Sequence, residues 1–158
     1  MLEIDIRITA GDLYDYMLMH TYHGASGILG SCFGALGVVV GFATQNWLLL
    51  IFGVIILLYL PWNLFLKSRL QFQSNAAFQE PLHYLLDDHG ITVSQKETTQ
   101  QQAWEDMVKA VSTARSIIIY TSGRNATIFP KAQLGDQKAL LIEMISTHMP
   151  PARVKIRT

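Results

Sequence analysis

The feature that most constrains this chain is a long stretch without charge. Asp15 and Lys67 are consecutive charged residues, so positions 16–66 contain no Asp, Glu, Lys or Arg. A soluble domain of ordinary composition carries about one charged residue in four, whereas a helix needs roughly 20 apolar residues to cross a bilayer. The stretch therefore predicts an apolar environment around this part of the chain, and it is long enough for two membrane-spanning helices. The alternative is a hairpin buried inside a large soluble protein, but a chain of 158 residues leaves too little sequence to enclose it.

The polar cluster Thr44-Gln45-Asn46 interrupts the apolar stretch near its middle. We therefore predict a transmembrane hairpin over residues 24–66, with spans at 24–43 and 47–66. At about 1.5 Å rise per residue, each span would cover about 30 Å, the thickness of a hydrocarbon core. Trp47, Tyr59 and Trp62 occupy positions near the span ends, where aromatic rings favour the headgroup level.

Basic residues predict the orientation of this hairpin. A loop of three residues places both flanks on the same side of the membrane, and Lys67 and Arg69 directly follow the second span. Lys and Arg close to a span tend to stay cytoplasmic. We therefore expect a multi-pass protein with both termini in the cytoplasm.

Glycines recur along the first span with a mean spacing of about 3.5 residues, which places them on one seam of a helix. Small residues let two helix backbones approach closely in lipid. The seam indicates either a homo-oligomer or the contact surface for the second helix, for example for Leu49, Phe52, Ile56 and Tyr59. The tethered second helix favours the latter. The seam consists of Gly27, Gly30, Gly34, Gly37 and Gly41.

Residues 1–23 predict a strand followed by an interfacial helix. Leu2, Ile4, Ile6 and Ile8 alternate with polar residues, which is the period of a strand with one apolar face. Thr9 and Asp12 then resemble a helix start. An isolated strand is unstable, so this strand must join a sheet formed beyond Lys67.

Residues 67–158 predict a cytoplasmic domain. The second span should continue as a helix to about residue 78, before Pro81. Short extended segments separated by turns follow, with a helix at 134–148. This order indicates one strongly bent antiparallel sheet closed by a C-terminal helix, as in pleckstrin-homology-like (PH-like) or GRAM-like domains. The expected strands are 82–86, 91–94, 99–104, 108–112, 117–120 and 127–129.

Four short motifs in this order carry a family resemblance: Asp88-His89-Gly90-Ile91, Trp104-Glu105-Asp106, Ile118-Ile119-Tyr120 and Ile128-Phe129-Pro130-Lys131. After two apolar helices, they resemble the YcxB-like family of bacterial membrane proteins. The resemblance implies an α+β protein of the bacterial inner (plasma) membrane, in which a two-helix hairpin carries a PH-like antiparallel domain. It implies no biochemical activity.

The sequence offers no set of residues for catalysis. It has no glycine-rich phosphate loop, no nucleophile elbow and no CxxC motif, so we expect no enzyme and no cofactor. His20 and His23 share a helix face, but a metal site needs further ligands, and interfacial histidines are the simpler interpretation. Glu105 and Asp106 should begin a helical turn beside a core Trp104. No strong basic field favours nucleic acid.

The C-terminal tail alternates cations with apolar residues. Either it holds the domain on anionic lipid, or it forms an edge strand protected by charge; the sequence leaves both open. The candidate lipid contacts are Lys67, Arg69, Arg153, Lys155 and Arg157.

Two functions fit these observations. The first is a membrane-tethered interaction or regulatory module whose domain binds a protein partner or lipid headgroups. The second is a small oligomeric pore or transporter-like protein assembled on the glycine seam. The spans lack the ionisable residues that usually mark an ion path.

Overall fold

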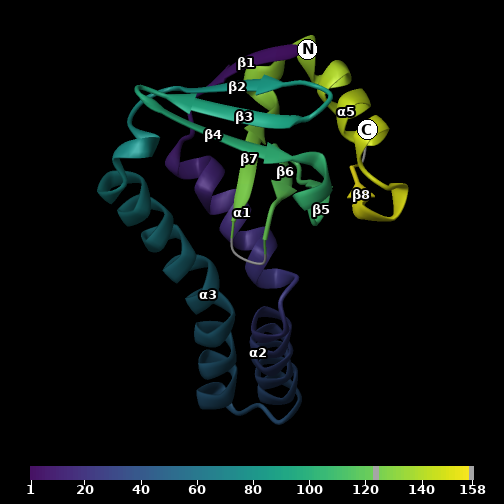
Figure 1. Ribbon diagram of the computed structural model, residues 1–158. Coiled ribbons are helices and arrows are strands. Elements are labelled where there is room, and N and C mark those ends of the chain that lie inside the picture. The colour runs from purple at the N-terminus through teal and green to yellow at the C-terminus, as the bar shows by residue number, and fades with distance from the viewer. Residues whose placement is uncertain (123–124, 157–158) are drawn as a thin grey trace.

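The computed structural model describes residues 1–122 and 125–156. It contains a pair of long apolar helices at one end and an α+β domain at the other (Figure 1). The helices are α2 (Ala25–Ala43) and α3 (Trp47–Ser74), preceded by α1 (Ala10–Tyr22). The α2–α3 connection lies at the end of the molecule opposite the domain and both chain ends (Figure 1).

The ends of these helices follow from local chemistry. Asn46 caps α3 by accepting a hydrogen bond from the Leu49 amide at 3.3 Å, and Gln45 in the connection has a positive φ of 51°. Helix α3 continues eight residues beyond the predicted span, to Ser74, and contains Pro61 without an interruption. The prediction of a helix extending past the apolar stretch is therefore confirmed, up to the 3-10 turn Ala76–Phe78.

The N-terminal segment connects the helices to the domain. Strand β1 (Leu2–Ile6) buries alternate residues. Thr9 then caps α1 in a capping box, because its side chain accepts from the Asp12 amide while the Asp12 carboxylate accepts from the Thr9 amide at 2.9 Å. As predicted, β1 joins strands beyond Lys67: Leu2 pairs with Leu86 and Ile6 pairs with Leu82.

Two four-stranded sheets form the domain. The first has the order β1-β2-β3-β4, where the strands after β1 are β2 (Leu82–Leu86), β3 (Gly90–Gln95) and β4 (Thr98–Ala103). The second has the order β7-β6-β5-β8, formed by β5 (Lys109–Ser112), β6 (Ser116–Tyr120), β7 (Ala126–Pro130) and β8 (Val154–Lys155). All pairs are antiparallel except β5 with β8.

This arrangement corrects the expected single antiparallel sheet. The 3-10 turn Trp104–Asp106 separates β4 from β5, and the buried Trp104 fixes that turn by donating its indole N–H to the Asp87 carbonyl at 2.8 Å. The expected helix at 134–148 corresponds to α5 (Gln137–His148), which begins three residues later than predicted, and a separate short helix that was not predicted, α4 (Lys131–Leu134), precedes it. Gly135 between them has a φ of 49°, a conformation that a helix cannot contain and that glycine adopts without steric cost.

The hydrophobic core lies between the two sheets, α1 and α5. Ile117, Ile118 and Ile119 in the central strand β6 are fully buried, as are Phe129 and Leu141. The remaining core residues come from the strands β1, β2, β3, β5, β6 and β7, from the helices and from the segments that connect them: Leu2, Ile4, Ile6, Ile8, Leu13, Tyr84, Leu86, Ile91, Trp104, Met107, Ala110, Val111, Tyr120, Ile128, Leu134, Ile145 and Met149.

Candidate functional site

The glycines of α2 lie against neighbouring helices. A Cβ added to Gly34 would lie 2.8 Å from the Leu57 side chain, one on Gly37 would lie 3.1 Å from the Gly53 Cα, and one on Gly41 would lie 2.5 Å from the Leu50 amide nitrogen. For Gly30 the nearest atom is in the Leu60 side chain, at 3.3 Å. Gly27 instead meets the Thr21 backbone at the end of α1.

The partners on α3 differ from most of those expected. Phe52 and Tyr59 point outward and are each 62% exposed, whereas the face toward α2 contains Leu50, Gly53, Leu57 and Leu60. Of the four residues predicted to fill the seam, Ile56 approaches the Gly34 position, at 3.2 Å. Helix α3 is thus rotated by about one residue from the predicted face. The rotation brings Gly53 against Gly37, so that both backbones meet where neither residue has a side chain.

The outer faces of α2 and α3 are apolar and exposed. Phe42, Trp47 and Leu48 are between 73% and 82% exposed, in contrast to the fully buried residues of β6. Both helices are long and apolar enough to cross a membrane. The small residues therefore face inward and the large apolar residues face outward, a pattern that is compatible with helices that cross a membrane.

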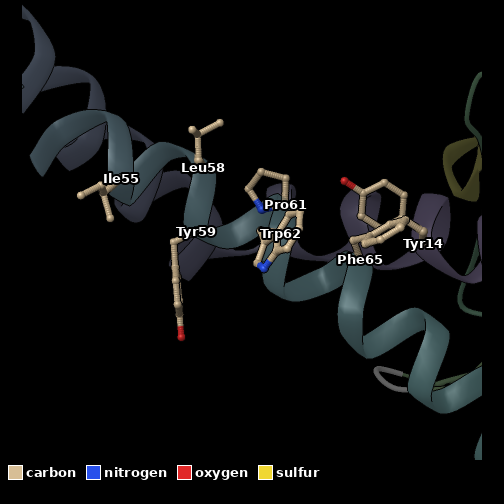
Figure 2. A pocket seen from close by; sticks show the side chains of 7 residues that line it. All are labelled: Tyr14, Ile55, Leu58, Tyr59, Pro61, Trp62 and Phe65. Atoms are coloured by element: carbon tan, nitrogen blue, oxygen red, sulfur yellow. The ribbon is translucent and has the colours of Figure 1, made fainter. Parts of the chain in front are cut away.

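An apolar depression of about 630 Å³ lies on the outer side of α3, next to α1. Figure 2 shows its walls, where Tyr14 from α1 approaches Phe65 near one end of the row of α3 side chains. The two rings meet edge to face, with centroids 5.7 Å apart. Pro61 and Trp62 lie midway along the depression, and the Arg69 guanidinium covers the Phe65 ring at 4.6 Å. The other lining residues are Ile55, Leu58 and Tyr59.

A second cavity, which we call the basic pocket, lies between the end of α1 and the second sheet. It has a volume of about 550 Å³ and lies beside Gly24, which caps the start of α2. Its lining includes two lysines and two histidines and no carboxylate. The complete lining is Met19, His20, His23, Gly24, Lys109, Val111, Ser112, Tyr120 and Lys155.

Aromatic stacking fixes one wall of the basic pocket. The Tyr120 ring lies 5.9 Å from Tyr16 and 6.1 Å from His20, both on α1. The Lys109 ammonium lies over the Tyr120 ring, 4.5 Å from the ring centroid. Burial raises the pKa of Tyr120 to about 12. Like an unshifted tyrosine, it is neutral at physiological pH, and its hydroxyl is able to donate a hydrogen bond.

The candidate lipid contacts are dispersed. Lys155 lines the basic pocket, whereas Arg153 donates to the Met107 carbonyl at 3.3 Å and Arg69 covers Phe65. Lys67 is exposed on α3, and Arg157 lies outside the described residues. Within the tail, Val154 and Lys155 form the edge strand β8, one of the two alternatives that the sequence left open.

The predicted acidic motif forms a separate polar surface. Trp104 is buried and stacks on His148 with ring centroids 5.2 Å apart, and His148 Nε2 lies 3.6 Å from Asp88. Glu105 and Asp106 are exposed beside it. Across the described residues 1–122 and 125–156, no three His, Cys, Asp or Glu side chains gather closely enough to hold a metal ion. His20 and His23 share the basic pocket without a third such ligand.

A family model described as YcxB-like protein matches residues 86–145. The chain carries a YcxB-like domain. The matched segment contains all four motifs on which the resemblance rests. It begins at the end of β2 and extends through α5 as far as Ile145. No curated protein and no solved structure matches the chain.

The basic pocket extends beyond the YcxB-like domain. Lys109, Ser112 and Tyr120 belong to the matched segment. His20 in α1 and His23 at its C-cap precede this segment, and Lys155 in β8 follows it. Sequence reasoning missed Lys109 and Tyr120. The pairing that places Lys109 opposite Tyr120 was the missing information, because the strands were predicted but their register was not.

Proposed function

We propose that this protein is a membrane-tethered interaction module. In this proposal α2 and α3 span the plasma (inner) membrane of a bacterium, and the domain lies at the cytoplasmic face, where it binds a protein partner or lipid headgroups. The observation that carries the proposal is the reversed burial in the hairpin. Gly34 and Gly41 are buried between the helices, while large apolar residues such as Phe42 and Leu48 are exposed.

Several features support this placement. The 19 residues of α2 would measure about 28 Å, close to the thickness of a hydrocarbon core. Lys67 and Arg69 lie on the domain side of the predicted span, as expected when the domain is cytoplasmic. Strand β1 and strand β2 flank the hairpin in sequence and pair with each other, which requires both flanks to be on one side.

We infer that the domain is a PH-like or GRAM-like module. Its support is the order of elements, in which successive short antiparallel hairpins are followed by α4 and α5, with only a 3-10 turn and the two-residue strand β8 after them. In such a module the sheets provide a rigid frame, and ligands bind at loops and edges. The basic pocket, at the edge formed by β5 and β8, has this position.

The pore alternative is less well supported. Helix α3 of the same chain packs against four glycines of the seam, so the seam is not free to assemble several copies around a channel. These glycines are Gly30, Gly34, Gly37 and Gly41. The helices also lack charged residues between Asp15 and Lys67.

Single-cysteine labelling tests the anchor and its orientation. In a Cys32→Ser background, Gln45→Cys would mark the α2–α3 connection and Thr98→Cys would mark the exposed start of β4. We expect a membrane-impermeant maleimide added to intact spheroplasts to label position 45 only, and to label position 98 after lysis. Labelling of position 98 in intact spheroplasts, or release of the protein from membranes by alkaline carbonate, would contradict the proposal.

The mass of the complex extracted gently into nanodiscs tests the interaction role. A second polypeptide at fixed stoichiometry would identify a protein partner. A homo-oligomer alone would instead favour assembly through the outer helix faces and would justify conductance measurements.

A further inference from the structure

We propose that the basic pocket binds the phosphate group of an anionic membrane lipid. The proposal deepens the function proposed above and rests on it for the lipid source of the phosphate. It starts from the composition of the pocket: its charged and titratable groups are Lys109, Lys155, His20, His23 and Tyr120. A phosphate group needs several hydrogen-bond donors and positive charge, and this lining provides both.

The two lysines come from neighbouring strands. Strands β5 and β8 are parallel, and Val111 is paired with Lys155. Lys109 lies two residues before Val111, so the two lysines lie diagonally across the two strands on the same face of the sheet. Neither lysine forms an ion pair with any carboxylate among the described residues. Their charges are therefore not neutralised by an acidic side chain, although the Lys109 ammonium also lies 4.5 Å from the Tyr120 ring centroid.

The nearby carboxylate of Asp15 is already engaged. It lies in the adjacent depression, where it accepts a hydrogen bond from the Thr113 hydroxyl at 2.5 Å. Lys131, which donates to the Thr113 carbonyl, lies close enough to Asp15 for the carboxylate to raise the lysine pKa, although burial and Lys138 lower it overall. The acidic side chain beside the pocket is thus engaged by the Thr113 hydroxyl.

The position of the pocket favours a lipid over a soluble phosphate compound. Met19 and His20 lie in the last turn of α1, His23 is its C-cap, and Gly24 directly precedes α2. Figure 1 shows this junction between the second sheet and the start of α2. Ile28 and Leu29 in the first turns of α2 are exposed by 51% and 57%. A lipid with its phosphate in the pocket could therefore place its acyl chains along α2.

Neutral donors complete the site. Ser112 provides a hydroxyl from β5, which would exchange its 3.3 Å hydrogen bond to the Thr113 carbonyl for one to the ligand, and the Tyr120 hydroxyl is protonated at physiological pH. Stacking of Tyr120 with His20 positions these two rings before any ligand arrives. A preformed site loses less conformational entropy on binding than a flexible basic tail.

Native mass spectrometry of the full-length protein in detergent micelles tests the proposal. Phosphatidic acid is the probe, phosphatidylcholine is the neutral-headgroup comparison, and inorganic phosphate is the soluble competitor. The variants are K109Q/K155Q, the charge-retaining K109R/K155R, and the control R115Q/K138Q, which removes the same charge from elsewhere in the domain. Removal of each pocket lysine should weaken phosphatidic acid binding about five-fold, and removal of both about 25-fold, because a cation near an anionic lipid contributes about 1 kcal/mol.

The expected result is weakened binding in K109Q/K155Q alone, with near wild-type binding in K109R/K155R and R115Q/K138Q. Equal loss in R115Q/K138Q, or no loss in K109Q/K155Q, would overturn the proposal. If the double variant does not fold, the single variant K155Q, at the exposed end of β8, is measured instead. It should weaken phosphatidic acid binding about five-fold. Displacement of the lipid by millimolar inorganic phosphate would overturn the lipid assignment in favour of a soluble phosphate site.

These outcomes are separable from those of the anchoring experiment. Binding in micelles does not require insertion into a bilayer, whereas maleimide labelling of positions 45 and 98 does not require the pocket. Correct labelling with unchanged binding in K109Q/K155Q rejects the pocket and retains the anchor. Selective binding with reversed labelling rejects the proposed orientation.

Discussion

The hairpin and the domain contain similar apolar side chains but differ in which of them are buried. In β6 all five residues from Ser116 to Tyr120 are buried, whereas in α3 the buried residues are Gly53 and Ser68. The hairpin buries its smallest residues and exposes its largest, and the domain does the reverse. Each half therefore has the burial pattern suited to a different solvent.

This difference has an energetic consequence. In the domain, removal of apolar surface from water stabilises the fold, at roughly 25 cal/mol per Å². If α2 and α3 lie in a bilayer, as proposed, that driving force is absent between them, and close packing across Gly37 and Gly53 must provide the stability. Substitutions should therefore affect the two regions according to different rules.

The largest expected effect is in the domain core. Phe129 is fully buried and packs against Tyr84 with ring centroids 5.0 Å apart. Phe129→Ala should reduce the free energy of unfolding by about 3–5 kcal/mol, through lost transfer energy and a residual cavity. Phe42→Ala is the matched control, because Phe42 is 78% exposed on α2. Chemical unfolding in detergent, followed by tryptophan fluorescence, compares them; similar losses would contradict the opposite burial of the two regions.

The next largest effect is expected in the hairpin, where adding a side-chain atom, rather than removing several, should be destabilising. A Cβ on Gly53 would lie 2.6 Å from the Val38 amide nitrogen and 2.8 Å from the Gly34 carbonyl oxygen. Gly53→Ala should destabilise the helix pair by about 1–3 kcal/mol, because the backbone must move apart. Val54→Ala, at a 38% exposed position on the same helix, should have little effect. Energy transfer between labels on α2 and α3 during SDS titration measures the separation, and equal midpoints for the two variants would exclude close packing at Gly53.

The sequence predicted the elements better than their mutual arrangement. The charge-free stretch located α2 and α3, and alternation located β1, because both patterns are local. The rotation of α3 was missed, since leucine and isoleucine occur all around this helix and hydropathy alone gives no preferred face. Gly53 is the one residue that could have indicated it, as the glycine of α3 that opposes the seam.

The candidate site was predicted only in fragments, for a related reason. Lys155 and the two histidines were noticed individually, but the basic pocket depends on the parallel pairing of β8 with β5. A strand of two residues gives almost no periodic signal. The division into two sheets was missed as well, because the contact of Trp104 with Asp87 is made across 17 positions of the chain.

A smaller effect is expected at the connection between the two regions. The Thr9 hydroxyl caps α1 and donates to the buried Asp12 carboxylate at 2.6 Å. Thr9→Ala should cost about 1 kcal/mol, the usual value for loss of an N-cap. Ser26→Ala is the control, because Ser26 is exposed in the first turn of α2, where no side chain caps the helix. Thermal unfolding of both variants measures the difference, and an equal change in midpoint would show that the cap contributes nothing.

The smallest effect concerns alkaline pH and is absent at pH 7. Burial raises the pKa of Tyr84 above that of a free tyrosine, about 10. Between these two values the folded state holds a proton that the unfolded state has lost, so the stabilisation is complete below pH 10 and decreases as pH rises above it. Tyr84→Phe removes this titration and should reduce the loss of stability measured between pH 9 and 11.

Tyrosinate absorbance distinguishes this cause from general alkaline unfolding. In the folded protein, the Tyr84→Phe variant should titrate like the wild type up to about pH 10, because Tyr84 contributes no tyrosinate there. Once the domain unfolds, the wild type should gain one additional tyrosinate. If the two proteins already differ by one tyrosinate below pH 10, Tyr84 is accessible to water and the boundary between the buried domain core and the exposed hairpin is less sharp than the structure indicates.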